Sequence, residues 1–259
     1  MESVRYEKRA GIAKVTLCRE SSHNAISREM NDRLWEIWRD FESDESTRVA
    51  ILTGSGDRAF CAGADLKDYI PTFFADSARA VRRNAARGLG GITRGLHRIY
   101  KPIIAAVNGY ALAGGFELAL ACDVRIASRN AVFGSFEIRR GFHHGDGGIV
   151  RLLASVGLAR TMDIVLTGRE IPAEEALSLG LVSRIVPAEA LLPTAEALAE
   201  QMAALSPSAV RSAKETIMEV VGRRLDDALL IEALFGYSSG DVADVRERLG
   251  KFFAREGKG

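Results

Sequence analysis

The stretch PIIAAVNGYALAGGFELALACD, residues 102–123, joins a buried strand to a short apolar helix through small residues. Its single glutamate, Glu117, follows the pair Gly114–Gly115 among Ala, Leu and Phe side chains. A carboxylate is costly to bury unless something pairs with it or uses it. The first N–H groups of a helix have no partner within the helix, and glycines let a ligand approach them closely. The stretch therefore predicts a place where a developing oxyanion binds beside a carboxylate.

Strands and helices alternate on both sides of this stretch, which indicates an α/β domain. We expect a hairpin over 4–19, an amphipathic helix over 21–46, a buried strand over 48–56 and a long helix over 77–100. Further strand is expected over 124–135, then helices over 160–168 and 172–181 and a closing strand over 182–187. From residue 190 onward only helices are predicted. We therefore expect a core over residues 1–190 and a C-terminal helical region over 191–259.

Composition narrows the classes of partner. The 259 residues carry a formal net charge of +1, which gives no electrostatic reason to expect nucleic acid or an anionic membrane. No apolar run reaches the ~18 residues of a spanning helix, and the N-terminus lacks an apolar signal core. We therefore expect a cytoplasmic protein. The three cysteines are widely spaced, which indicates small buried core residues rather than a disulfide framework. We find no cluster of ligands for a metal in the sequence.

Two other stretches repeat the strand-then-small-residue layout. FCAGADL, residues 60–66, follows a strand and offers Gly63 and Ala64, so two loops together could supply the two N–H groups of an oxyanion hole. The alternative is that these are only tight turns. A second acid, Glu137, stands in VFGSFEIRRG, residues 132–141, where it either joins Glu117 or pairs at the surface with a neighbouring arginine. Two carboxylates in one poorly hydrated pocket would have their pKa values pushed apart.

The chain resembles the crotonase superfamily, the enoyl-CoA hydratases and isomerases. The resemblance rests on FCAGADL, AAVNGYALAGGFELALACD, FGSFEIRRG, VLTGREIPAEEALSLGLVSRIVP and SPSAVRSAKE, which occur in order over nearly the whole chain. It implies an α/β spiral of ββα units, C-terminal helices that mediate trimerisation, and a coenzyme A thioester as substrate. It places the oxyanion hole at the N–H groups of Ala64 and Gly114, and the two catalytic acids at Glu117 and Glu137.

The function implied by this resemblance is enoyl-CoA hydratase activity, without a metal or a separate cofactor. Glu117 would hold and activate water, and Glu137 would supply a proton to the α-carbon, both by general acid–base catalysis. A double-bond isomerase, or another CoA-enolate enzyme acting on a polar or cyclic acyl group, is the alternative. A weakly catalytic binding protein is disfavoured because both acids are retained. The near-neutral charge argues against RNA as its ligand.

The resemblance also implies which residues contact the substrate. The acyl thioester and pantetheine arm are expected against Ala62, Ala64, Asp65, Leu66, Lys67, Gly114, Gly141, His143 and His144. The CoA phosphates require cations, and Arg28, Arg58 and Lys67 are candidates. Phe252 and Arg255 in the tail would reach the CoA of a neighbouring subunit in a homotrimer or a hexamer built from two trimers.

One segment departs from the family pattern. After Glu137 the chain reads RRGFHHGDGGIVRL, residues 139–152, in which His143, His144 and Asp146 replace the apolar or small residues expected there. These side chains either line a polar acyl pocket and move protons, or belong to a solvated loop. The first interpretation predicts a preferred substrate other than a simple straight-chain enoyl-CoA.

Overall fold

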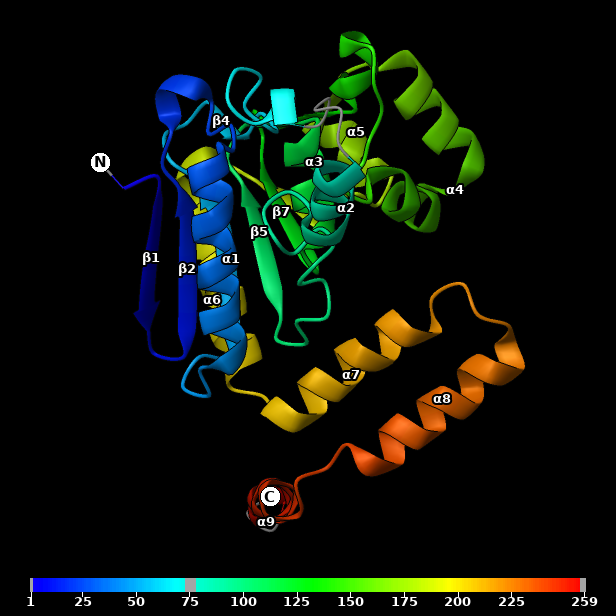
Figure 1. Cartoon of the computed structure of the whole chain (residues 1–259). Coiled ribbons are helices and arrows are strands. Elements are labelled where there is room, and N and C mark those ends of the chain that lie inside the picture. The colour runs from blue at the N-terminus through cyan, green and yellow to red at the C-terminus, as the bar shows by residue number, and fades with distance from the viewer. Residues whose placement is uncertain (1, 73–77, 257–259) are drawn as a thin grey trace.

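The computed structural model describes residues 2–72 and 78–256 (Figure 1). Its strands are β1 (Val4–Arg9), β2 (Ile12–Leu17), β3 (Val49–Gly54), β4 (Ala59–Cys61), β5 (Ile103–Val107), β6 (Tyr110–Leu112), β7 (Val124–Ser128), β8 (Val132–Gly134), β9 (Ile171–Pro172) and β10 (Arg184–Val186). Its α-helices are α1 (Arg28–Ser43), α2 (Ala78–Arg87), α3 (Gly114–Ala121), α4 (Gly148–Thr167), α5 (Ala173–Ser178), α6 (Leu191–Ala203), α7 (Pro207–Val220), α8 (Leu225–Ser238) and α9 (Val242–Glu256). Short 3₁₀ helices are η1 (Glu20–Ser22), η2 (Ile70–Thr72), η3 (Phe136–Arg140) and η4 (Ala188–Ala190).

Two sheets are built from repeated pairs of strands. The larger has the order β1-β2-β3-β5-β7-β10, and the smaller has the order β4-β6-β8-β9. The successive pairs β3–β4, β5–β6 and β7–β8 each give their first strand to the larger sheet and their second to the smaller. Within each sheet these strands run parallel to one another. This repetition confirms the expected α/β spiral of ββα units, and it brings the ends of β4, β6 and β8 close together.

Strand alternation divides the larger sheet between two apolar clusters. Ala50 and Leu52 of β3 belong to the main core, which also contains the buried face of α1. Val49 and Ile51, the alternate positions, pack with α6 on the opposite face. Figure 1 shows α1 and α6 on opposite sides of this sheet. Burial on both faces explains why the sequence reads as a continuous apolar run at β3 and again at β5.

Helix α1 lies within the range predicted as helix, 21–46, but it begins only at Arg28. Ser27 caps its N-terminus, since the Ser27 hydroxyl accepts a hydrogen bond from the Met30 N–H. The expected apolar face is buried, with Leu34, Trp38 and Phe41 each fully inaccessible. The spacing of these residues at three and four positions places them on one side of the helix.

The long helix expected over 77–100 is wrong in its second half, and residues 73–77 lie outside the described residues. α2 ends at Arg87, and Gly88, Gly90 and Gly91 then adopt positive φ values of 73°, 68° and 78°. Glycine occupies such conformations without the penalty that a Cβ would add. The resulting loop turns the Leu89 N–H toward Asp146, and this contact belongs to the site described below.

The last three helices extend away from the sheets, with α7 and α8 packed side by side (Figure 1). The boundary expected at residue 190 precedes α6, which packs against β3 and β5, so the extension begins with α7. Large apolar side chains stay exposed on it, namely Ile217, Val221, Leu225, Leu229, Leu230, Leu234, Val242, Leu249, Phe252 and Phe253. In the described ranges, no helix is both long and apolar enough to cross a bilayer.

Candidate active site

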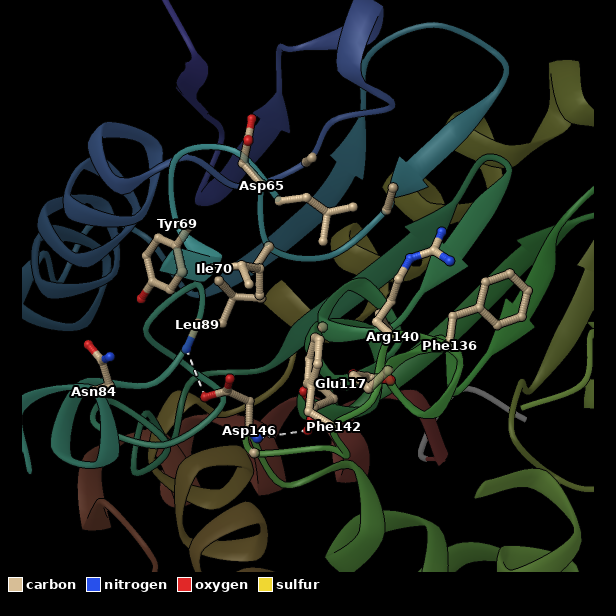
Figure 2. A pocket seen from close by; sticks show the side chains of 18 of the residues that line it. Asp65, Tyr69, Ile70, Asn84, Leu89, Glu117, Phe136, Arg140, Phe142 and Asp146 are labelled. Carbon is tan, nitrogen blue, oxygen red and sulfur yellow. Dashed lines mark hydrogen bonds between the residues drawn. The ribbon is translucent and has the colours of Figure 1, made fainter. Parts of the chain in front are cut away.

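A cavity of about 620 Å³ opens where β4, α3, η3 and the 88–100 loop meet (Figure 2). It brings together residues from widely separated parts of the sequence. The lining includes Ala62, Ala64, Asp65, Leu66, Lys67, Tyr69, Ile70, Asn84, Leu89, Arg94, Gly114, Glu117, Phe136, Glu137, Arg140, Phe142, His143 and Asp146. Apolar side chains from η2, the 88–100 loop and η3 surround a small number of acids and bases, as in most small-molecule sites.

Glu117 lies in the first turn of α3 and is only 2% exposed. Its Oε1 accepts hydrogen bonds from the backbone N–H groups of Asp146, at 2.7 Å, and Gly148, at 2.9 Å. The residue before the helix, Ala113, has a positive φ of 52° with ψ of −127°, a backbone conformation that is strained for a residue with a Cβ. The fold thus fixes one oxygen of the carboxylate firmly, and burial of this acid is compensated by two backbone donors.

The backbone nitrogens of Ala64 and Gly114 lie close together at the start of this helix. A Cβ built on Gly114 would lie 3.6 Å from the Ala64 nitrogen, and one built on Gly63 would lie 3.0 Å from the Gly114 nitrogen. Neighbouring peptides are paired, since the Ile26 N–H donates to Gly63 O and the Asp65 N–H to Ile26 O. Among the described residues, no acceptor takes the N–H of Ala64 or Gly114. The geometry is that of two adjacent donors available to one oxyanion.

Glu137 lies on η3 and is 4% exposed, so it is not the surface acid of the alternative interpretation. His144 Nδ1 lies 2.9 Å from Glu137 Oε1 and 3.4 Å from Glu117 Oε1. The closer contact has the distance of a hydrogen bond but imperfect angles, and neither Glu137 oxygen has an aligned donor within the described chain. Burial raises the pKa of Glu137, and the contact with His144 opposes this rise only partly.

His144 itself is 5% exposed, and its Nε2 lies 2.7 Å from the Ser135 hydroxyl. Burial alone would lower its pKa, but hydrogen bonds and charges from Glu117 and Glu137 outweigh burial and raise the pKa of His144 to about 9. The two carboxylates therefore favour the protonated form of the imidazole. The solvated-loop interpretation is wrong for His144, whereas His143 is exposed and its Nδ1 lies 2.7 Å from the carbonyl of His144.

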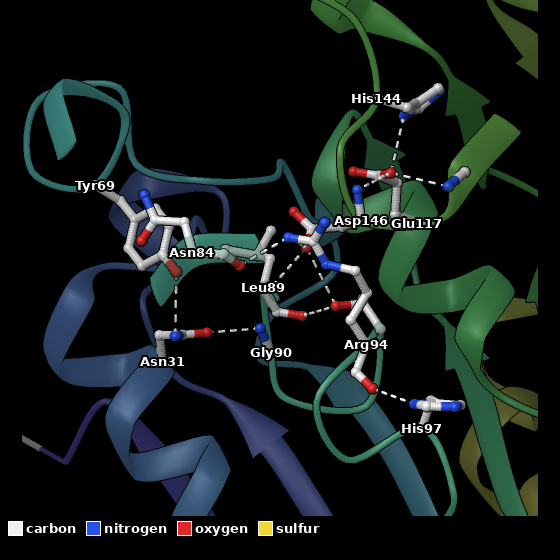
Figure 3. A network of polar contacts seen from close by, with 12 residues as sticks. Asn31, Tyr69, Asn84, Leu89, Gly90, Arg94, His97, Glu117, His144 and Asp146 are labelled. Carbon is white, nitrogen blue, oxygen red and sulfur yellow. Dashed lines mark hydrogen bonds and ion pairs between the residues drawn. The ribbon is translucent and has the colours of Figure 1, made fainter. Parts of the chain in front are cut away.

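Asp146 is the third buried acid, and Figure 3 shows it beside Glu117 on the side away from His144. Its Oδ1 accepts a hydrogen bond from the Leu89 N–H at 2.9 Å and lies 3.3 Å from the Arg94 guanidinium. Burial, followed by the charge of Glu117, raises the pKa of Asp146 to about 6. The solvated-loop interpretation is wrong for this residue as well, because Asp146 is a buried acid in the cavity wall.

Several of the other predicted contact residues are found in the wall of the cavity. Ala62, Leu66 and Lys67 line the cavity. Asp65 lines it too, although its carboxylate is held by Arg19 at 2.9 Å and by the N–H groups of Lys67 and Asp68.

Several predicted residues do not reach the cavity. Gly141 and Arg58 are outside its lining. Arg28 lines a separate, polar depression, where it forms an ion pair with Asp68. Phe252 is exposed on α9 and the side chain of Arg255 lies outside the described residues, so their contact with the CoA of a neighbouring subunit stays a prediction.

Three potential metal ligands converge here, a cluster that the sequence analysis did not find. One ligand atom each from Glu117, Glu137 and His144 lies within 4.8 Å of the others. In this structure the three side chains contact one another directly, with His144 Nδ1 2.9 Å from Glu137 Oε1 and 3.4 Å from Glu117 Oε1.

The sequence analysis missed most of the side chains that give the cavity its shape. Tyr69, Leu89, Phe136 and Phe142 line the cavity, and Arg94 forms its polar wall with Asp146. Aromatic and aliphatic residues of this kind have the same sequence signal as ordinary core. Only the glycines around Leu89 indicated that the chain turns back at that point.

Comparison with known proteins agrees with this geometry. The sequence profile of the family described as enoyl-CoA hydratase/isomerase matches residues 7–257. The chain is 38% identical to a probable mitochondrial enoyl-CoA hydratase of Dictyostelium discoideum, over 95% of this chain and 86% of that protein. It is 37% identical to the (E)-benzylidenesuccinyl-CoA hydratase of Thauera aromatica, over 94% of this chain and 93% of that protein. The crystal structure of an enoyl-CoA hydratase from Bacillus anthracis matches with a TM-score of 0.87 and 35% identity, over 99% and 97% of the two chains.

Proposed function

The chain belongs to the enoyl-CoA hydratase/isomerase family, and from this premise we propose that it adds water across the 2,3 double bond of an enoyl-CoA thioester. The observation that supports this most directly is the meeting of two buried carboxylates, Glu117 and Glu137, beside the unpaired N–H groups of Ala64 and Gly114. Addition of water needs one group that activates the water and another that protonates the α-carbon. It also needs hydrogen-bond donors for the negative charge that develops on the thioester oxygen.

In the proposed reaction the thioester carbonyl oxygen binds between the N–H groups of Ala64 and Gly114. Attack of water at the β-carbon moves negative charge onto this oxygen, since the double bond is conjugated with the carbonyl. Loss of one such donor typically costs about 3 kcal/mol of transition-state stabilisation. The N–H of Gly114 also lies at the positive end of α3, which favours the same charge.

The two acids divide the proton transfers between them. Glu117 holds its Oε1 against the backbone, so its other oxygen is the one that orients the water and takes a proton from it. Glu137 gives a proton to the α-carbon, because its raised pKa makes the protonated form accessible. The fixed carboxylate acts as the base and the loosely held carboxyl group as the acid.

The buried acid Asp146 favours a polar acyl group over a plain hydrocarbon chain. Its Oδ1 has the Leu89 N–H and Arg94 as partners, but an apolar chain would cover the second oxygen without offering it a donor, which costs free energy. A substrate that carries a hydroxyl, amide or second carboxyl group could bind Asp146 or Arg94. A double-bond isomerase, or another CoA-enolate enzyme on such an acyl group, is the second candidate that the same residue supports.

We also propose that the chain assembles as a homotrimer, alone or as a pair of trimers, through α7–α9. The apolar side chains along these helices exceed what a single extended arm buries. The exposed cations Lys67 and Arg140 line the open side of the cavity and suit the phosphates of CoA. We further propose that the chain binds no nucleic acid and acts in the cytoplasm.

A panel of enoyl-CoA thioesters tests the proposal. Each would be incubated with the protein in H₂¹⁸O, and products would be separated by mass and double-bond position. Gain of one labelled water supports hydration, whereas a shifted double bond without mass gain supports the isomerase. Hydration of crotonyl-CoA at least tenfold faster than that of carboxylated or hydroxylated analogues would contradict the polar acyl group. No turnover of any thioester would contradict the function itself.

A further inference from the structure

We propose that His144 is a positioning residue that stores the catalytic proton, holding it between Glu137 and Glu117 so that Glu137 can deliver it to the substrate. The proposal rests on the proposed hydration reaction and assigns a role to a side chain that does not line the cavity. His144 therefore acts through the two carboxylates rather than on the substrate.

The imidazole is enclosed by three parts of the chain. Its Nδ1 lies against Glu137 of η3, at 2.9 Å, and Glu117 of α3, at 3.4 Å. Its Nε2 lies 2.7 Å from the hydroxyl of Ser135. The start of α4 packs against the ring at Gly148, where a Cβ would lie 2.7 Å from His144 Cγ and Nδ1. Glycine at this position makes room for the histidine, so the ring occupies a space built for it.

The charges facing the ring favour an imidazolium. Glu117 and Glu137 both approach Nδ1, and Asp146 adds a third negative charge near Glu117. Arg151 of α4 is the further cation whose charge interacts with Glu117. Two carboxylates so close together cannot both ionise readily without a cation between them. With His144 protonated, both carboxylates can ionise, because Nδ1 lies within ion-pair distance of each and Nε2 hydrogen-bonds with the Ser135 hydroxyl.

With the stored proton, one turnover of hydration leaves the number of protons on the protein unchanged. The pair His144–Glu137 shares one proton across 2.9 Å, and its imidazole–carboxylic acid form has the proton on Glu137. As the water oxygen bonds to the β-carbon, Glu117 takes one water proton, and Glu137 gives its own proton to the α-carbon. The product thus leaves with the hydroxyl and one added hydrogen. Glu117 then releases its proton to solvent and His144 takes one up, which restores the imidazolium and both carboxylates.

Replacement of His144 by Asn tests this role. The amide nitrogen of Asn can occupy the place of Nδ1 and donate a hydrogen bond, but it cannot carry the stored proton. We expect kcat of His144→Asn to fall at least tenfold while KM changes less than threefold. The wild-type kcat should fall at alkaline pH as the pair loses its proton, and this limb should shift in the variant, where Glu137 holds its proton without the imidazole.

A second variant changes the proton affinity without removing the ring. Ser135→Ala removes the acceptor of Nε2–H, so the alkaline limb should move to lower pH while the plateau value of kcat stays within threefold. The matched control is His23→Asn, because His23 is exposed, lies outside the cavity lining and has φ of 51°, which Asn tolerates. Its kcat and pH profile should be those of the wild type.

Nitrogen-15 NMR of the four imidazoles decides the protonation state without any assay of activity. One ring, absent from the spectrum of His144→Asn, should keep both nitrogens protonated at pH 7.5. A neutral His144 at this pH overturns the proposal, as does a pH profile of His144→Asn that parallels the wild type. Absence of hydration by the wild-type protein would overturn the proposed function instead, and the NMR result would still stand.

Discussion

Two substitutions of Glu117 separate its chemical role from its structural one. In Glu117→Gln the amide oxygen can still accept the N–H groups of Asp146 and Gly148, but the other atom becomes an NH₂ that cannot take a proton from water. Loss of a general base typically costs 10²- to 10⁴-fold in rate, about 3–5 kcal/mol of activation free energy. In Glu117→Ala the same base is lost and, in addition, both N–H groups lose their acceptor.

The loss of the acceptor in Glu117→Ala also lowers the stability of the folded protein. Each buried N–H left without an acceptor costs about 1–3 kcal/mol. We therefore expect Glu117→Ala to have a free energy of unfolding at least about 2 kcal/mol below that of Glu117→Gln, while both have a kcat at least about a hundredfold below wild type. KM should change far less than kcat in Glu117→Gln, because the lost interaction belongs to the transition state.

The assay is loss of the conjugated enoyl-thioester absorbance for turnover, with urea unfolding for stability. Glu36→Gln is the matched control, because Glu36 is exposed on α1 and pairs with Arg33, one turn away on the same helix. It should leave both quantities unchanged. A Glu117→Gln variant with more than a tenth of wild-type kcat would refute the catalytic role. Equal stability of the two Glu117 variants would refute the account of the backbone hydrogen bonds.

Three further predictions concern other parts of the molecule. Gly114→Val should abolish turnover in a protein that circular dichroism shows to be folded, because even its Cβ would lie 2.3 Å from Leu89 Cδ2; a folded, fully active variant would move the oxyanion site elsewhere. Because the pKa of Asp146 is raised to about 6, this group binds its proton more tightly in the folded chain than in the unfolded chain. Its contribution to the free energy of unfolding therefore falls as pH rises from about 4 through 6. Asp146→Asn should therefore melt at a higher temperature than wild type at pH 8 but not at pH 4, and equal differences at both pH values would contradict this. Light scattering should give a trimer or a hexamer at micromolar concentration, and a monomer would contradict assembly through α7–α9.

The sequence by itself determined the local elements and the identity of the two main acids. Period-two and helical spacing are properties of neighbouring residues, so the hairpin, α1 and the strand–helix unit around Gly114 could be predicted from them. The placement of Glu117 and Glu137 came from the motifs that carry the family resemblance, together with the cost of burying a lone carboxylate.

Only the tertiary structure decided how the loops close on those acids. Gly88, Gly90 and Gly91 end α2 early, because a positive φ at each lets the chain turn back and present Leu89 to Asp146. His144 was ambiguous in sequence, since histidine suits both a solvated loop and a buried ion pair. What fixed its state is its contact with carboxylates 27 and 7 positions away along the chain, which local spacing does not encode. Local periodicity follows from the backbone geometry of each segment, whereas convergence of charges depends on how separate segments pack.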